Sequence, residues 1–349
     1  MITTTIGFDI AKSVFQVHGT DERGKATVCR QVRRAEVMKF FANLPPCLIG
    51  MEACASAHHW ARKISSHGHT VKLIAPQFVK PYVKTNKNDA RDAEAICEAV
   101  SRPSMRFVPV KTVEQQAVIA LHRVRQGFVE ARTAQSNQIR GLLAEFGIVL
   151  PRGTSHLRGR IDGILEDADN GLPGISRELF MRLFAHFKDL DRNVAELERQ
   201  IRAAHREDDA SQRLEAIPGI GPLSASALVA SIGDAKAFKN GRQLAAWMGL
   251  VPRQNSSGGT TRLLSISKRG DSYLRTLLIH GARSVIRHRT RQAGQAGQAE
   301  GWLTRLASRR HPNIAAVALA NKNARIVWAL LAHDRQYEAE HGAPTAVAA

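Results

Sequence analysis

The chain has 349 residues, 44% of them hydrophobic, which is enough to bury more than one hydrophobic core. Lysine plus arginine number 50 against 31 aspartate plus glutamate, and the formal net charge of +19 favours a polyanionic partner, with nucleic acid as the default. We find neither a run of about 18 apolar residues nor a secretory signal pattern, so we expect a cytoplasmic protein with no membrane partner.

The cysteines carry no metal-binding pattern. The four, at Cys29, Cys47, Cys54 and Cys97, are scattered without a C-x-x-C pair. Such usage argues against structural zinc and fits a reducing compartment. We expect these cysteines to be small buried hydrophobic residues.

The first stretch, TIGFDIAKSVFQVHG from Thr5 to Gly19, predicts two strands joined by a short turn at residues 11–13, because apolar residues flank the turn on both sides. One carboxylate, Asp9, lies in the middle of this apolar stretch. A charged group in a sheet is costly to bury unless it is paired or binds a metal. The alternative is that Asp9 caps the turn by accepting hydrogen bonds from backbone N–H groups.

Strands and helices alternate through the rest of the first hundred residues. The patterns predict strands at 26–32, 47–52 and 70–75, and helices at 35–43, 55–66, 76–84 and 89–100. Three strands followed by strands that alternate with helices are typical of a mixed α/β sheet of the ribonuclease-H-like kind.

Four carboxylates stand out in this part: Asp9 on the first strand, Glu52 at the end of the fourth, and Asp89 and Asp92 one helical turn apart. Two-metal cleavage of a phosphodiester needs several oxygen ligands around a pair of Mg²⁺ ions. Each acid also has a structural alternative. Asn88 or Asp89 can cap the helix with Asp92 completing a capping box, and a glutamate at a strand end can simply be solvated. Only the four together point to a metal site.

The middle of the chain is predicted to be helical. Residues 112–146 form one long predicted helix, whose basic face suits either sugar-phosphate contacts or plain solvation. Residues 151–173 are turn-rich and are expected to be a loop. From Phe180 to Ile201, apolar residues recur every three or four positions, the heptad pattern of a coiled coil. We expect an antiparallel helical hairpin that dimerises, with packing inside a single chain as the alternative.

Residues 214–235 predict a helix-hairpin-helix with a Pro-Gly-Ile-Gly-Pro turn. Gly219 and Gly221 allow positive φ angles and close backbone approach, so exposed N–H groups there can hold a DNA phosphate. The alternative is a turn that merely connects two packed helices.

The most reactive-looking segment is RQNSSGGTTRLLSISKRGDSYLR, residues 253–275. A serine attacks phosphorus only when a base or metal removes its proton and cations hold the developing charge. We predict Ser257 as the nucleophile, with Ser256 and Ser267 as alternatives, although a Ser/Gly loop is often only a flexible connector. The segment also supplies five cations for contacts with nucleic acid: Arg253, Arg262, Lys268, Arg269 and Arg275.

The motifs IGFDIAKSVFQVHG, GMEACASAHHWAR and KNDARDAEAI resemble the DEDD motifs of bacterial insertion-sequence transposases of the one-ten family and of its relative, the Piv-type DNA invertase. IPGIGPLSASALVASIGDAKAF, WMGLVPRQNSSGGTTRLLSISKRGDSYLRTLL and NKNARIVWALL resemble the C-terminal transposase domain of that family. The resemblance covers nearly the whole chain.

The resemblance implies a RuvC-like N-terminal domain in which Asp9, Glu52, Asp89 and Asp92 bind Mg²⁺, with two ions in each composite site. It further implies that a serine of another subunit, Ser257 in our prediction, attacks DNA to form a covalent 5′-phosphoserine. Donor and target DNA, a guide (bridge) RNA, and a homodimer or homotetramer are the implied partners.

We therefore expect an RuvC-like domain at 1–110, a helical dimerisation region at 111–210, a mainly helical transposase domain at 211–338 and a tail at 339–349. The predicted function is that of a DNA transposase or recombinase acting in the cytoplasm on the nucleoid. A structure-specific endonuclease would use the same acids with water as the nucleophile. An actin-like kinase needs glycine-rich phosphate loops that DIAKS lacks, and a non-catalytic scaffold leaves the acids unexplained.

Overall fold

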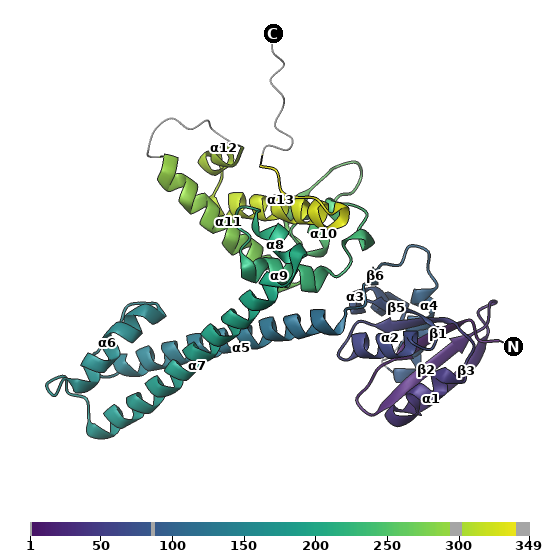
Figure 1. The fold of residues 1–349 in the computed structure, drawn as a ribbon, viewed down its shortest axis with the longest axis horizontal. Coiled ribbons are helices and arrows are strands. Elements are labelled where there is room, and N and C mark those ends of the chain that lie inside the picture. The colour runs from purple at the N-terminus through teal and green to yellow at the C-terminus, as the bar shows by residue number, and fades with distance from the viewer. Residues whose placement is uncertain (1, 85–87, 294–301, 340–349) are drawn as a thin grey trace, which may run out of the picture. The chain divides into compact units, whose positions relative to one another are not determined.

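The chain divides into two units, which are described separately. The structure is a computed structural model that describes residues 2–84, 88–293 and 302–339. Unit 1 comprises Met1–Val113 and Ile232–Asp234, and unit 2 comprises Glu114–Ser231 and Ala235–Ala349 (Figure 1). The finer domain boundaries expected from the sequence stay a prediction.

Unit 1 is built on a mixed sheet, as predicted, and the sheet has six strands. Its strands are β1 (Thr5–Asp9), β2 (Val14–Thr20), β3 (Ala26–Arg33), β4 (Leu48–Glu52), β5 (Thr70–Ile74) and β6 (Phe107–Val108). Their order across the sheet is β3-β2-β1-β4-β5-β6, with the first three antiparallel, β1, β4 and β5 parallel, and β6 antiparallel to β5. This mixed sheet agrees with a ribonuclease-H-like domain. The strand β6 was not predicted, because two residues are too few to form a periodic pattern.

The helices of unit 1 follow the predicted order, with ends that differ by a few residues. They are η1 (Arg34–Glu36), α1 (Val37–Ala42), α2 (Ala57–Ser65), α3 (Pro76–Val79), η2 (Lys80–Tyr82) and α4 (Asp89–Val100). Aromatic side chains fill the core, where Phe8 packs edge-on against Phe41 at 5.2 Å and Phe15 against Trp60 at 5.3 Å between ring centroids. These aromatic contacts hold α1 and α2 on the sheet.

The expectation that all four cysteines are buried is wrong for two of them. Cys47 and Cys97 are buried, whereas Cys29 and Cys54 are exposed. Cys29 is on β3, the edge strand of the sheet, and Cys54 is in the loop after β4, where less of the chain covers the side chains.

Unit 2 begins with three helices: α5 (Val113–Ala144), α6 (Thr154–Glu166) and α7 (Gly174–Arg206). The long helices α5 and α7 are antiparallel, since Arg125 pairs with Glu198 at 2.5 Å and Arg132 pairs with Asp191 at 2.7 Å. Figure 1 shows them crossing as a hairpin closed by α6. The prediction of a loop at 151–173 is wrong, because Leu157 and Ile161 of α6 are buried in the core of this hairpin.

The heptad residues of α7 are covered by this chain itself. Phe180, Phe184 and Phe187 pack in one cluster with Ile139 and Leu143 of α5. Packing inside a single chain, the alternative weighed for the heptad pattern, therefore accounts for this part of the apolar seam.

The rest of unit 2 is mainly helical and surrounds one apolar helix. Its elements are α8 (Asp209–Glu215), α9 (Pro222–Ile232), η3 (Ala235–Ala237), α10 (Gly241–Trp247), β7 (Pro252–Gln254), β8 (Leu263–Ile266), α11 (Ser272–Ala293), α12 (Trp302–Arg309) and α13 (Pro312–His333). Helix α13 contacts α8, α10, α11 and α12, so it forms the centre of this part of unit 2. It is the one described helix that is long and apolar enough to cross a membrane, a property it shares with core helices.

One low-complexity stretch and the predicted tail lie largely outside the described residues. The stretch TRQAGQAGQAEGW includes residues 294–301, and the predicted tail at 339–349 includes residues 340–349.

Candidate functional site

Two of the predicted acids lie at one edge of the sheet of unit 1. Strands β1 and β4 are parallel neighbours with Phe8 opposite Met51, so Asp9 and Glu52 end adjacent strands. The carboxyl edge of parallel strands is where open α/β sheets hold their ligands. The sheet therefore brings together two acids that are far apart in the sequence.

Helix α4 approaches this edge because two strand residues are glycines. A Cβ at Gly7 would lie 2.0 Å from the carbonyl oxygen of Ala93, and one at Gly50 would lie 2.7 Å from the Cβ of Val100. Only glycine lets the helix lie so close to β1 and β4. We did not identify these two positions from the sequence, although a glycine inside a strand is itself a signal of close backbone approach.

The first turn of α4 supplies the other two acids. Asn88 caps the helix, its side-chain oxygen accepting a hydrogen bond from the N–H of Ala90 at 3.0 Å. Carboxylate oxygens of Asp89, Asp92 and Asp9 all lie within 4.8 Å of one another. We refer to these three residues as the acid cluster. The cap is provided by Asn88, so the capping role considered for Asp89 is taken by its neighbour.

The acid cluster perturbs the titration of Asp9. Burial, and then the charges of Asp92, Asp89 and Glu52, raise the pKa of Asp9 from 3.8 to about 6, against a smaller lowering effect from the backbone of Ile10. Glu52 therefore acts on Asp9 electrostatically, although it is not one of the three acids whose oxygens lie within 4.8 Å. Like charges held this close favour either a proton or a cation between them.

The donor set fits a hard divalent cation. Every ligand it offers is a carboxylate oxygen, the ligand type that Mg²⁺ prefers. Burial and then the neighbouring acids raise the pKa of Asp9, and a cation would offset both effects. The first turn of α4 is the positive end of its helix dipole and lies beside these acids. This positive end lowers the free energy cost of holding the carboxylates close together.

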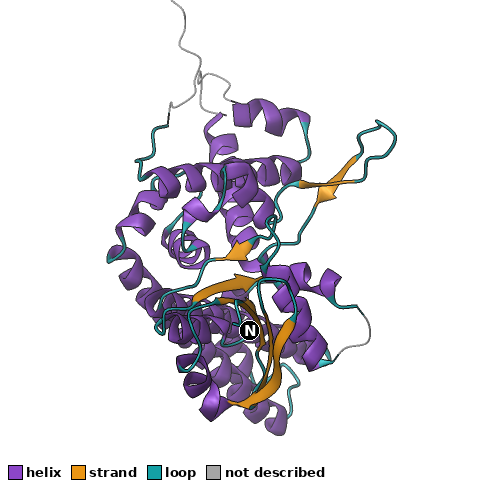
Figure 2. Ribbon diagram, turned by 90° about the vertical axis from the view of Figure 1, so that its right-hand side faces the viewer, coloured by secondary structure: helices purple, strands orange, loops and turns teal. Residues whose placement is uncertain are grey.

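The predicted serine lies at the tip of a β-hairpin rather than in a loop without secondary structure. Strands β7 and β8 pair antiparallel, and Ser257 forms a bridge with Thr260 beyond them. Gly258 and Gly259 have φ angles of 54° and 75°, which is the pattern of a tight two-residue hairpin turn. Figure 2 shows the two-stranded ribbon extending away from the helices around it. Ser257 is exposed, and within the described chain no hydrogen bond holds its hydroxyl.

The two alternative serines differ from Ser257 in their surroundings. The Ser256 hydroxyl oxygen accepts hydrogen bonds from Gln254 Nε2 at 2.9 Å and from the N–H of Arg262 at 3.3 Å, so it stabilises the hairpin. The Ser267 hydroxyl oxygen is buried without a hydrogen-bond partner among the described residues. Of the three, Ser257 is the one that is exposed and whose hydroxyl forms no hydrogen bond within the described chain.

The five predicted cations lie in this hairpin and in the segment that follows it. Arg253, Arg262, Lys268 and Arg269 are exposed. Arg275 has a structural contact instead, because its guanidinium donates to the carbonyl oxygens of Met248 at 3.2 Å and Gly270 at 3.1 Å.

The glycine turn between α8 and α9 packs against α11. Gly219 has a φ of 89°, and a Cβ there would lie 2.9 Å from the carbonyl carbon of Gly281. Gly221 is exposed, with open space around it. This contact supports the alternative in which the turn connects packed helices. Phosphate binding by the N–H groups of the turn stays a prediction.

Comparison with known proteins covers both units. A DEDD family model described as "Transposase" matches residues 6–148, and one described as "Transposase IS116/IS110/IS902 family" matches residues 211–297. A Pseudomonas aeruginosa protein named "Probable family 20 transposase" is 56% identical over 97% of this chain and 99% of its own length. The chain belongs to the IS116/IS110/IS902 family of transposases.

Two further members name the elements they serve. The "Transposase for insertion sequence element IS1111A" of Coxiella burnetii is 46% identical over 95% of this chain and 90% of its own. The "Transposase for insertion sequence element IS1328" of Yersinia enterocolitica is 45% identical over 93% and 96%. The resemblance drawn from the DEDD and C-terminal motifs is confirmed, and transposases of this family are in general enzymes that cleave and recombine DNA.

Proposed function

We propose that this transposase cleaves and exchanges DNA strands through a covalent 5′-phosphoserine at Ser257, with Asp9, Glu52, Asp89 and Asp92 as its metal-binding acids. The observation that carries the proposal is the convergence of Asp9, Asp89 and Asp92 within 4.8 Å beside the strand that ends in Glu52. The exposed Ser257 at a hairpin tip supports the choice of nucleophile.

The four acids would hold two Mg²⁺ ions, which when bound supply Lewis-acid stabilisation of the charge on the phosphate oxygens. The acids themselves carry the same charge as the phosphate, so their role is to hold the cations at this edge of the sheet. Around the hairpin, Arg253 and Arg262 are exposed cations that can bind the DNA backbone next to the reacting phosphate.

In the covalent step, Ser257 Oγ forms a bond to phosphorus while the bond from phosphorus to the 3′-oxygen breaks. The serine loses its proton and the departing 3′-oxygen gains one, so the step consumes no other reactant. A 3′-hydroxyl of a second strand then reverses the reaction and releases Ser257. Since the phosphodiester energy is conserved in the serine ester, no ATP is required.

Several parts of the proposal concern assembly. Acids of one subunit and Ser257 of another form the composite site in a homodimer or homotetramer. The hairpin of α5 and α7 serves as the coiled-coil dimerisation region, and the α8–α9 turn serves as a helix-hairpin-helix for DNA. A guide (bridge) RNA pairs with donor and target DNA, which the net charge of +19 favours. The enzyme acts in the cytoplasm on the nucleoid.

A second candidate, a structure-specific endonuclease, is favoured by the acid cluster alone, because water can replace serine as the nucleophile. The two functions differ in what Ser257→Ala does. The transposase mechanism requires that this variant lose both strand cleavage and the protein–DNA adduct, whereas the endonuclease would still cut.

The experiment incubates the full chain with labelled donor DNA, Mg²⁺ and candidate guide RNA, then detects a denaturant-stable protein–DNA adduct and maps its residue. Ser256→Ala and Ser267→Ala are the matched controls, since each removes one hydroxyl from the same segment. An adduct mapped to Ser267 would replace the nucleophile and keep the mechanism, while cleavage by Ser257→Ala without an adduct would favour the endonuclease.

A further inference from the structure

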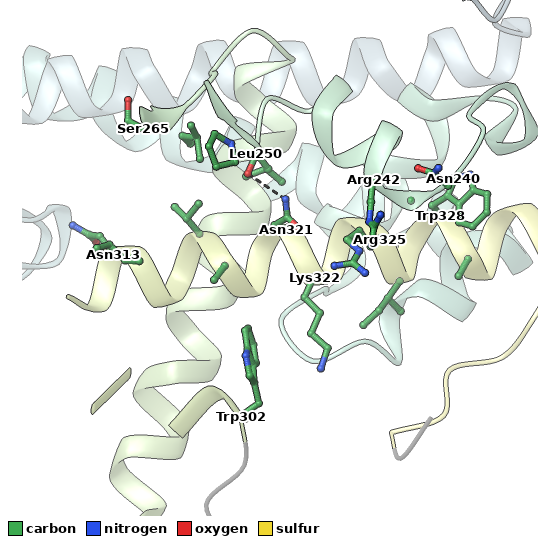
Figure 3. Close-up of a pocket in the computed structure, with 18 of the residues that line it drawn as sticks. Asn240, Arg242, Leu250, Ser265, Trp302, Asn313, Asn321, Lys322, Arg325 and Trp328 are labelled. Carbon is green, nitrogen blue, oxygen red and sulfur yellow. Dashed lines mark hydrogen bonds between the residues drawn. The ribbon is translucent and has the colours of Figure 1, made fainter. Parts of the chain in front are cut away.

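Unit 2 contains a large groove that the proposed chemistry does not use. It has a volume of about 1360 Å³, above the roughly 300–1,000 Å³ typical of a pocket for one small ligand. One face of α13 forms its floor, and the start of α10, strand β8 and Trp302 of α12 form its sides (Figure 3). A groove of this size suits an extended ligand.

The floor of the groove is an apolar stripe with polar groups along it. Ile314, Val317 and Ala318 recur at helical spacing on α13, and Ile314 is 54% exposed. Asn321 continues the stripe, and its side-chain amide donates to the carbonyl oxygen of Leu250 at 3.2 Å, which ties α13 to the segment before β7. An apolar strip this open is suited to flat, partly apolar groups such as nucleobases.

The charged residues of the groove are all cations. Arg242, Lys322 and Arg325 are exposed, and no described residue that lines the groove is acidic. Gly241 lies against the backbone of Arg325, since a Cβ there would be 2.9 Å from the Cα of Arg325, so Arg242 and Arg325 come from adjoining positions on α10 and α13. Within the described chain none of these three cations forms an ion pair. Neighbouring cations that have no acidic partner match a chain of phosphates.

Trp302 adds an aromatic surface to this row. Its ring is 5.2 Å from Lys322 Nζ, yet the residue remains 44% exposed. An exposed tryptophan costs free energy in water, and a stacked base is its usual partner in proteins that bind single strands. The same cation that lies over the ring can pair with the phosphate next to that base.

From these features we propose that this groove binds an unpaired segment of nucleic acid, with Trp302 stacking on a base and Arg242, Lys322 and Arg325 contacting phosphates. Leu264, Ser265 and Ile266 of β8 line the groove and also form the stem of the hairpin that carries Ser257. A strand held in the groove is therefore positioned next to that stem. This inference deepens the proposed function, but it concerns binding and needs no cleavage.

The test measures fluorescence anisotropy of labelled single-stranded RNA, single-stranded DNA and duplex DNA with the full chain in the absence of divalent cations. Trp302→Ala should weaken single-strand binding about tenfold, the effect of losing one stacked base. Trp302→Phe, which keeps an aromatic face, should restore most of the affinity. Both variants should bind duplex DNA as the unchanged protein does.

The cations are tested by a matched pair of charge reversals. Arg325→Glu should weaken single-strand binding and reduce the slope of log affinity against log salt by at least about 0.7. Arg335→Glu makes the same charge change at an exposed position outside the groove, and should leave the slope unchanged. Circular dichroism melting of each variant verifies that it is folded.

The outcomes separate this inference from the cleavage mechanism. Ser257→Ala should bind single strands normally, so loss of cleavage there says nothing against the groove. A preference for RNA over DNA would assign the groove to a guide, and the opposite preference to an exchanged strand. Unchanged single-strand affinity in folded Trp302→Ala and Arg325→Glu would overturn the proposal. A change only in sedimentation would likewise overturn it, and would instead mark the groove as a contact between copies.

Discussion

His122 of α5 and Tyr273 of α11 are 151 residues apart in the sequence, and His122 Nδ1 lies 2.9 Å from the Tyr273 hydroxyl. The other ring nitrogen, Nε2, lies 3.0 Å from Ser226 Oγ of α9. Ser226 donates its own proton to the carbonyl oxygen of Pro222 at 2.8 Å, so Nε2 carries the hydrogen and Nδ1 accepts the tyrosine proton. One neutral imidazole thus joins three helices of unit 2.

This network predicts that the folded protein loses stability in acid. Burial, with a smaller effect of Arg125, lowers the pKa of His122 from 6.5 to about 4. The unfolded chain therefore binds a proton below pH 6.5 that the folded chain does not bind until about pH 4. The resulting stability is present above pH 6.5 and is lost as the pH falls toward 4, by up to about 3 kcal/mol.

His122→Gln is the variant that checks the window. We expect it to be less stable at pH 7 and to lose less stability between pH 6.5 and 4 than the unchanged protein, as measured by urea unfolding at each pH. Tyr273→Phe, which removes one hydrogen bond but keeps the histidine, should cost about 1 kcal/mol and keep the pH dependence. Parallel pH profiles for His122→Gln and the unchanged protein would contradict the assignment.

Asp9→Asn should make the folded protein more stable and less active. Because the folded pKa of Asp9, about 6, lies above its ordinary 3.8, its charge destabilises the fold, and this penalty develops as the pH rises through that window. At pH 7.5 without divalent cations we expect Asp9→Asn to be more stable by on the order of 1 kcal/mol, a figure reduced for partial exposure. At pH 4 the difference should vanish.

The same variant should lose DNA cleavage and the rise in melting temperature that Mg²⁺ gives the unchanged protein. Glu22→Gln removes one negative charge from an exposed turn of unit 1 and serves as the control. Equal stabilisation by both variants at pH 7.5 would show that net charge, rather than the acid cluster, is responsible.

Gly7→Ala tests the close approach of α4. The added Cβ meets backbone atoms, 2.0 Å from Ala93 O and 2.5 Å from Cys97 N, so the helix must move off the sheet. We expect a loss of at least about 2 kcal/mol and weaker cation binding, since the first turn of α4 carries Asp89 and Asp92. Gly127→Ala, on α5 with open space around it, should instead gain about 0.5–1 kcal/mol from helix propensity. Thermal melting and titration with Mn²⁺ measure the two effects.

Two aspartates that are two residues apart on α7, and so on different faces of the helix, should differ in their effect on stability. Asp191 accepts from Arg132 of α5 and Arg158 of α6, both at 2.7 Å, and thereby joins three helices. Among the described residues, Asp189 pairs with Arg192 of its own helix and with no other cation, and both side chains are exposed. We expect Asp191→Ala to cost about 1–2 kcal/mol in urea unfolding, and Asp189→Ala less than about 0.5 kcal/mol. Equal losses would mean that the contacts with α5 and α6 contribute little.

Prediction from pattern worked best where elements are long or strictly periodic. Helix α4 was predicted at its observed bounds, and the long helices α5 and α7 were found, because polar and apolar residues recur over many turns. Helix α6 was missed because its glycines and flanking turns hide a short apolar repeat of Leu157 and Ile161. The sequence predicts a loop around Ser257 rather than a hairpin, because the three- and four-residue strands carry no alternation of burial.

The choice of acids followed from their positions on predicted elements and from the resemblance, which needs only local motifs. The sequence patterns do not predict that these acids meet in space. Asp9 and Asp92 are brought together by a parallel strand pair and by a helix that can approach the sheet because two strand residues are glycines. The groove of Trp302 and Arg325 had no signal in the sequence, because its sides come from separate helices and a strand. Local patterns report which face of a segment is buried, whereas a site depends on which segments meet, and that is settled by packing between residues distant in the chain.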